Sequence, residues 1–196
     1  METQRFIRYL MFVTFCAIII RIFLFPSSSL IKLPYHKGTG FYITFPKHGW
    51  EKDMLRSTKE EFLKDDYVPE QVVYVTKEKN MMHENPAASI SVYSVRMRDA
   101  MFIEDEFSSI MENIEKTGSR ITDHGQVKLD DRLCYWTLYQ EALTGLIKLE
   151  FYTVDDTNRF YRLTYATYPD TFGKYRDDFE ATKDSMKFTT LNIEGI

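Results

Sequence analysis

The last forty residues constrain the fold most, because they place an amphipathic helix directly after a strand. Residues 159–167 (RFYRLTYAT) are rich in aromatic and β-branched side chains, which favour a strand. Pro169 ends that strand, and residues 170–188 read as one helix. Its apolar residues recur at spacings of three, four and seven: Phe172, Tyr175, Phe179 and Met186. Such a stripe needs a surface to cover, so the sequence predicts a sheet with this helix packed across it.

A second helix is expected over residues 104–117, where one apolar face consists of Phe107, Ile110, Met111 and Ile114. Gly118 supplies its C-terminal stop. Further strands are expected at residues 41–45, 72–76, 89–97, 133–139 and 146–154. The turn at 155–158 makes the last two strands an antiparallel hairpin. Residues 51–70 read as a loop with a short helix. The order predicts an α+β fold, an antiparallel sheet with helices packed against it.

The N-terminal segment, residues 6–25, is mostly apolar and is interrupted by Arg8 and Arg21. The stretch from Tyr9 to Phe25 would form about 25 Å of helix, near the lower limit for crossing a membrane. Arg21 lies close enough to its end to reach the interface. We therefore expect an uncleaved signal anchor in residues 1–29. Its anchoring side chains would include Phe6, Tyr9, Phe12, Ile18, Ile20 and Phe25.

The alternative is a secretory signal that is cleaved near Ser29 and releases a secreted domain. Both alternatives export the domain, because Arg5 and Arg8 would hold the N-terminus in the cytoplasm. Residues 30–40 contain a proline and two glycines and read as a linker. The folded domain is then expected over residues 41–190, outside the cytoplasm.

Charge argues against one class of partner. The chain has 25 basic and 29 acidic residues, of which four basic and one acidic lie in residues 1–32. Residues 33–196 therefore carry a net charge of −7. Phosphate backbones repel an acidic domain, so nucleic acid is not an expected partner.

Candidate sites for chemistry are sparse. The four histidines are all expected in loops and show no metal-binding spacing, and the weak metal candidates are His83 and Glu84. Acidic doublets such as Asp130-Asp131 occur, but no calcium-binding loop motif does. Cys134 is expected to be buried, with Trp50 and Trp136 in the core. No nucleophile motif is present, so we expect no enzyme and assign no catalytic residue.

Two segments resemble the PsbP-like domain family, whose superfamily includes the Ran-binding Mog-type and bacterial DcrB-like proteins. Residues 41–50 (FYITFPKHGW) are similar to the opening of that domain, and residues 158–188 to its end. The residues that carry the resemblance are Phe41, Pro46, Trp50, Tyr161, Tyr165, Phe172, Phe179 and Phe188. The resemblance covers roughly residues 38–190. It implies an α-β-α sandwich around an antiparallel sheet of about six strands.

The resemblance also implies function classes. PsbP is a lumenal subunit of photosystem II that helps to retain calcium and chloride. We expect a membrane-anchored, non-catalytic binding module, an accessory or assembly factor for a membrane protein complex. The alternatives are a photosystem II-associated protein that binds calcium or manganese, and a hydrolase.

Overall fold

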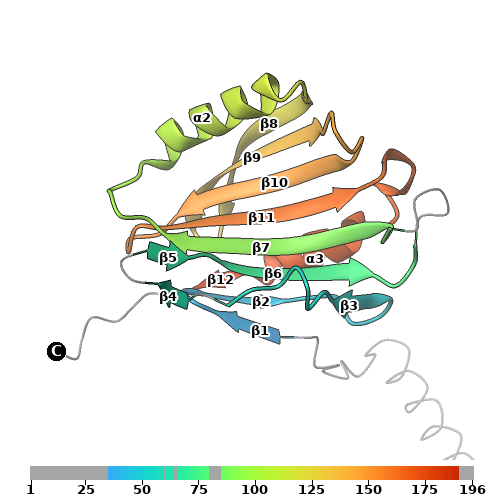
Figure 1. Ribbon diagram of the computed structural model, residues 1–196, viewed down its shortest axis with the longest axis horizontal. Helices are drawn as coiled ribbons and strands as arrows, with labels where there is room; N and C mark the ends of the chain where they lie inside the picture. The colour runs from blue at the N-terminus through green and yellow to red at the C-terminus, as the bar shows by residue number, and fades with distance from the viewer. Residues whose placement is uncertain (1–34, 60, 64–65, 80–84, 190–196) are drawn as a thin grey trace, which may run out of the picture. The chain divides into compact units, whose positions relative to one another are not determined.

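The computed structural model describes residues 35–59, 61–63, 66–79 and 85–189, which all belong to one unit, residues 34–196. Seven strands form an antiparallel sheet in the order β3-β6-β7-β11-β10-β9-β8 (Figure 1). They are β3 (Trp50–Lys52), β6 (Glu70–Thr76), β7 (Ala88–Arg96), β8 (Arg120–Leu129), β9 (Arg132–Gln140), β10 (Ile147–Val154) and β11 (Arg159–Thr167). The α+β prediction is confirmed, with seven strands in this sheet where about six were expected.

Two smaller sheets complete the strands. β1 (Tyr35–Gly38), β2 (Phe41–Thr44) and β12 (Lys187–Phe188) form a three-stranded antiparallel sheet. β4 (Glu61–Leu63) pairs with β5 (Asp66–Val68). A linker was expected over residues 30–40, but Tyr35–Gly38 of this range form β1, which pairs with β2 in a hairpin. The described residues of 51–70 contain strands and turns and no helix, so the short helix expected there is wrong.

The helices differ in how well the sequence predicts them. Helix α2 (Ile103–Lys116) matches the expected range. The single helix expected over 170–188 is wrong. The chain instead forms a 3-10 turn, η1 (Pro169–Thr171), and a short helix, α3 (Arg176–Asp184), before it enters β12. Gly173 lies in the turn between η1 and α3, where glycine disfavours a continuous helix.

The two faces of the large sheet carry different layers, because strand side chains alternate. In β10, Leu149 and Phe151 face the larger core together with α3 and the small sheet. Tyr152 points to the opposite face, where it packs with Phe107 of α2. α2 packs against β8, β9 and β10, and Figure 1 shows α2 and α3 on opposite faces of the sheet.

The residues that carry the family resemblance gather in the larger core. Six of them are buried there: Phe41, Trp50, Tyr161, Tyr165, Phe179 and Phe188. Phe172 packs against this core from its edge, and Pro46 is half-buried. Cys134 and Trp136 face the same core, as the sequence predicts. The expected anchor residues of 6–25 lie outside the described residues.

Candidate functional site

The histidines do not form a site in the part of the chain that the structure describes. His36 lies in β1, with its Nε2 3.1 Å from an oxygen of Glu70, and His124 is exposed on β8. The expectation that both lie in loops is therefore wrong. His48 is exposed in a turn, and His83 and Glu84 lie outside the described residues. No described group of three or more His, Cys, Asp or Glu side chains is placed to hold a metal ion.

The strongest candidate site is a groove between α2 and the uncovered part of the sheet face beside it. It encloses about 510 Å³, within the range typical of small-molecule sites. One wall is a stripe of α2 that includes Glu106, Ile110 and Ile114. These residues recur at spacings of about one helical turn and so lie on one side of the helix. The floor belongs to the central strands of the sheet.

The floor comes from four neighbouring strands. Tyr93 and Val95 belong to β7, Phe160 and Arg162 to β11, Glu150 and Tyr152 to β10, and Tyr139 to β9. The register brings them together. Arg162 lies opposite Tyr93 on one side and opposite Tyr152 on the other. Glu150 lies one row further along and opposite Thr164. Charged, hydroxyl and aromatic groups thus meet at the centre of the sheet.

Glu150 is the buried charge of this floor. The residue is only 5% exposed. Tyr139 donates a hydrogen bond of 3.1 Å to one carboxylate oxygen, and Tyr152 donates to the same oxygen. Thr164 donates to the other oxygen at 2.9 Å. Three hydroxyl donors therefore compensate the loss of hydration that a buried carboxylate suffers.

The two tyrosines of this cluster keep their protons. Burial raises the pKa of Tyr139 and of Tyr152, and the negative charge of Glu150 raises both pKa values further. Neither phenol can lose its proton near neutral pH, so both remain hydrogen-bond donors. A phenolate that acts as a base or nucleophile is not available here.

Arg162 has a buried donor that the described protein does not use. Its guanidinium lies 5.1 Å from the centre of the Tyr93 ring, a cation–π contact that holds it over the floor. Its Nε is buried and has no hydrogen-bond acceptor among the described residues. A buried donor without an acceptor is destabilising by about 1–3 kcal/mol. An acceptor on a ligand could supply what the protein does not.

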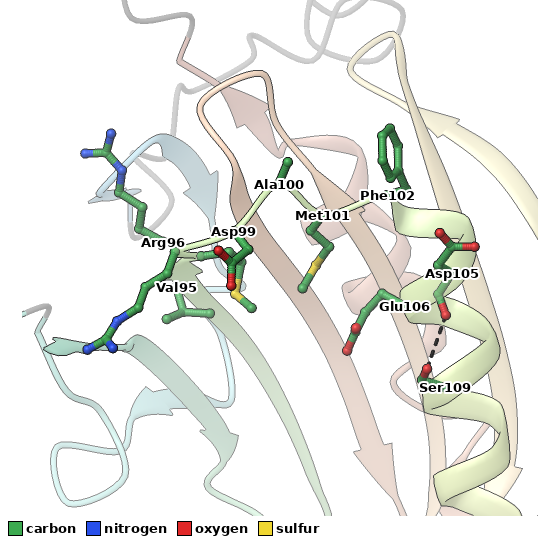
Figure 2. Close-up of a pocket in the computed structure, with 11 residues that line it drawn as sticks. Val95, Arg96, Asp99, Ala100, Met101, Phe102, Asp105, Glu106 and Ser109 are labelled. Atoms are coloured by element: carbon green, nitrogen blue, oxygen red, sulfur yellow. Dashed lines mark hydrogen bonds between the residues drawn. The ribbon is translucent and has the colours of Figure 1, made fainter.

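The groove opens toward a second hollow at the start of α2, shown in Figure 2. This hollow encloses about 590 Å³ and shares four lining residues with the groove, namely Val95, Met97, Met101 and Glu106. Figure 2 shows Met101 and Glu106 extending into the space between the end of β7 and the helix. The two hollows therefore adjoin, and flexible methionines lie where they meet.

Nucleophilic side chains near the groove are engaged elsewhere. The hydroxyl of Ser119 lies 2.9 Å from that of Thr117 and accepts the amide of Ala142. Cys134 faces the opposite core, where burial raises the pKa of its thiol to about 11. No described histidine lines the groove. The arrangement can bind a molecule of mixed polarity, but it does not place a base beside a nucleophile.

The sequence gives only part of this site. The alternation in residues 146–154 places Lys148, Glu150 and Tyr152 on one side of a strand, and the structure confirms that. Nothing in the sequence signals that Arg162 and Tyr139, on the two neighbouring strands, lie beside them. A charged residue in the middle of a strand with buried neighbours is the only available indication.

None of the helices in the described ranges is both long enough and apolar enough to cross a membrane. This finding does not extend to residues 1–34.

Comparisons with known proteins point to one fold. No protein-family model matches the chain, and no curated protein matches it by sequence. Among solved structures, cyanobacterial PsbP from Synechocystis sp. PCC 6803 superposes with a TM-score of 0.53 at 13% identity, over 79% of this chain and 91% of that one.

Two further structures superpose equally well. LpqN of Mycobacterium tuberculosis, described as involved in cell envelope biogenesis, gives a TM-score of 0.54 at 10% identity, over 79% of this chain and 87% of that one. PA94 of Pseudomonas aeruginosa, a protein of unknown function, gives 0.54 at 12% identity, over 68% and 99% of the two chains. At such identities the likeness establishes the fold.

Proposed function

We propose that this chain, which has the PsbP-like fold, is a non-catalytic binding module that works outside the cytoplasm. Residues 6–25 tether it to the membrane, and the groove beside α2 is its binding site. In this role the module is an accessory or assembly factor for a membrane protein complex. The apolar N-terminal segment supports the tether, and the solved relative involved in cell envelope biogenesis is consistent with an exported domain.

The observation that carries the proposal is the floor of the groove. Its carboxylate accepts hydrogen bonds from three hydroxyl groups, and its tyrosines keep their protons. These groups are arranged for recognition, because they offer fixed donors and acceptors and the tyrosines do not supply a base. Arg162 adds a cation whose Nε has no hydrogen-bond acceptor in the described protein.

The tether and the partner are tested together in native membranes. Full-length protein is expressed in its own host, the membranes are washed with alkaline carbonate, and the N-terminus is determined by mass spectrometry. Retention in the pellet with residues 6–25 intact, and cross-linking to one membrane protein, is the expected result. A released domain that starts near residue 30 and cross-links to nothing would contradict the proposal.

The absence of catalysis is tested separately. Purified full-length protein is assayed against ester, phosphate and glycoside substrates, beside the variants Glu150→Gln and Glu112→Gln. Glu112 is an exposed helix residue that pairs with Lys116, so it controls for the loss of a carboxylate. We expect no activity in any sample. Turnover that the Glu150 variant loses and the Glu112 variant keeps would make the groove an active site.

A further inference from the structure

The charges that line the groove indicate which head groups it accepts. Three carboxylates and one guanidinium line it, from Glu106, Glu141, Glu150 and Arg162. Lys148 forms an ion pair with Glu141. Arg162 balances Glu150, a diagonal neighbour on the adjoining strand about 7 Å away. Glu106 has no ion-pair partner among the described residues, so the lining has a small negative excess.

That excess disfavours anionic ligands. A carboxylate or phosphate near Arg162 would also lie near Glu150, which is buried and poorly screened. The net charge of −7 over residues 33–196 opposes the approach of an anion as well. An uncharged acceptor meets neither obstacle. The ester or amide carbonyl oxygen of a ligand can accept from the guanidinium without adding a negative charge.

Apolar side chains form much of the rest of the lining, and Asn113, Thr117 and Ser119 add polar groups at the C-terminal end of α2. Met97 and Met101 lie where the groove meets the second hollow, Val95 and Phe160 belong to its floor, and Ile110 belongs to its helix wall. The helix wall from Glu106 to Thr117 is about 16 Å long, because an α-helix rises 1.5 Å per residue. A single extended chain fits a trough of this kind. Methionine side chains adapt to irregular apolar shapes without a fixed packing partner.

We propose that the groove binds an uncharged amphiphile with one apolar chain and an ester or amide head. The carbonyl oxygen of the head accepts from Arg162, and the chain lies along α2 toward Met97 and Met101. This inference rests on the proposed function, since it names the ligand of the same groove. It goes further in assigning the head group and the direction of the chain.

The test uses full-length protein in phospholipid nanodiscs and a monodecanoylglycerol that carries a photoactivatable diazirine in its chain. After irradiation, labelled peptides are mapped by mass spectrometry. Labels should concentrate on residues 95–116. Unlabelled monodecanoylglycerol should compete about tenfold better than decanoate, which has the same chain with an anionic head. Equal competition by decanoate would overturn the choice of an uncharged head.

Two variants and one control locate the contact. Arg162→Met should reduce labelling about tenfold, the loss expected for hydrogen bonds from a charged donor. Ile110→Trp should reduce it by filling the trough, if thermal unfolding shows that the variant is folded. Arg176→Met is the matched control, because Arg176 also lies over an aromatic ring, Phe172, but on α3. Labelling that is insensitive to both groove variants would refute the site.

The same experiment separates this inference from the proposed function. A protein that stays in the membrane and cross-links to a membrane partner, but whose groove takes no label that unlabelled monodecanoylglycerol competes away, refutes the ligand assignment alone. A protein whose groove is labelled as expected but which has lost residues 6–25 supports the ligand and contradicts the tether.

Discussion

The hydroxyl of Tyr161 donates a hydrogen bond of 2.7 Å to the buried carboxylate of Asp155, which closes the turn between β10 and β11. The same hydroxyl lies 3.2 Å from the carbonyl oxygen of Gly40, in the turn between β1 and β2. Asp155 also accepts the amides of Thr157 and Arg159, at 2.8 and 3.0 Å. One tyrosine thus joins the end of the large sheet to the small sheet.

Removing that hydroxyl should destabilise the domain. We expect Tyr161→Phe to lower the free energy of unfolding by about 1–2 kcal/mol, because a buried carboxylate loses a donor. The control is Tyr74→Phe. Tyr74 stacks on Phe45 at 4.1 Å, and its hydroxyl makes no hydrogen bond within the described residues. Urea unfolding measures the loss of free energy of unfolding in both variants. Equal losses would show that the hydrogen bond from Tyr161 to Asp155 does not stabilise the domain.

Asp155 should also make stability depend on pH. Burial raises its pKa, but the hydrogen bonds from Thr157 and Tyr161 outweigh burial and hold that pKa below its usual range. A lowered carboxyl pKa stabilises the folded state above the unfolded-state pKa, near 3.9 for aspartate. That stabilisation is lost as the pH falls through the folded-state pKa.

The expected result is a free energy of unfolding that declines from about pH 5 toward pH 2, with a shallower decline for Asp155→Asn. Asp156→Asn is the matched control. Asp156 is the next residue, its side chain is 82% exposed, and its ion pair with Arg132 lies at the surface, where such pairs contribute little. Urea unfolding at several pH values gives the slopes. An Asp155→Asn slope equal to that of wild type would contradict the prediction.

The sequence predicts the largely buried strands at the centre of the sheet and fails for the exposed strand at its edge. The alternation in β10 is visible because apolar Leu149 and Phe151 alternate with Glu150 and Tyr152, although all four residues are buried. The long strand β8 was not predicted. It lies at the edge of the sheet and most of its residues are exposed, so no apolar period of two marks it. The hydrogen-bonded pairing with β9 holds these residues in a strand, although their sequence pattern does not predict one.

The helix near the C-terminus shows a different failure. Phe172, Phe179 and Met186 do reach one core, as their spacing predicts. Only Phe179 lies within α3, however, and the others reach that core from non-helical backbone. The groove could be predicted only in part, from the side of the strand that carries Glu150. Arg162, Glu150 and Tyr139 belong to three strands, and only the register between those strands brings the side chains together.

Two glycines offer a test of the contact between Gly40 and Tyr161. Both Gly40 and Gly49 have positive φ, at 82° and 76°. A Cβ on Gly40 would lie 2.3 Å from the Tyr161 hydroxyl, whereas nothing lies within 4 Å of a Cβ on Gly49. Gly49→Ala should therefore destabilise by about 1 kcal/mol through backbone strain alone.

Gly40→Ala should destabilise by about 3 kcal/mol, because steric overlap adds to the same backbone strain. Thermal unfolding of the two variants measures the difference. Adding Tyr161→Phe to Gly40→Ala should recover part of the loss, since it removes the overlapping atom. If the two alanine variants are equally stable, the close approach of Gly40 to Tyr161 is not a constraint on the fold.

In the turn between β8 and β9, replacing two neighbouring aspartates by glycine should change the free energy of unfolding in opposite directions. Asp130 and Asp131 both have positive φ, 49° and 63°, a conformation that glycine adopts without strain. Asp130 has a compensating role. Its carboxylate accepts the amide of Phe188 and the ammonium of Lys187, each at 2.8 Å, and so ties the turn to β12.

Asp131→Gly should therefore raise the free energy of unfolding by about 0.5 kcal/mol, because it relieves strain and removes no side-chain hydrogen bond within the described residues. Asp130→Gly relieves similar strain but should lower the free energy by about 1–2 kcal/mol, since the amide of Phe188 loses its acceptor. Urea unfolding at neutral pH measures both. If both variants raise the free energy of unfolding, backbone strain outweighs the hydrogen bonds of Asp130. If both lower it, relief of strain contributes less than the lost carboxylates.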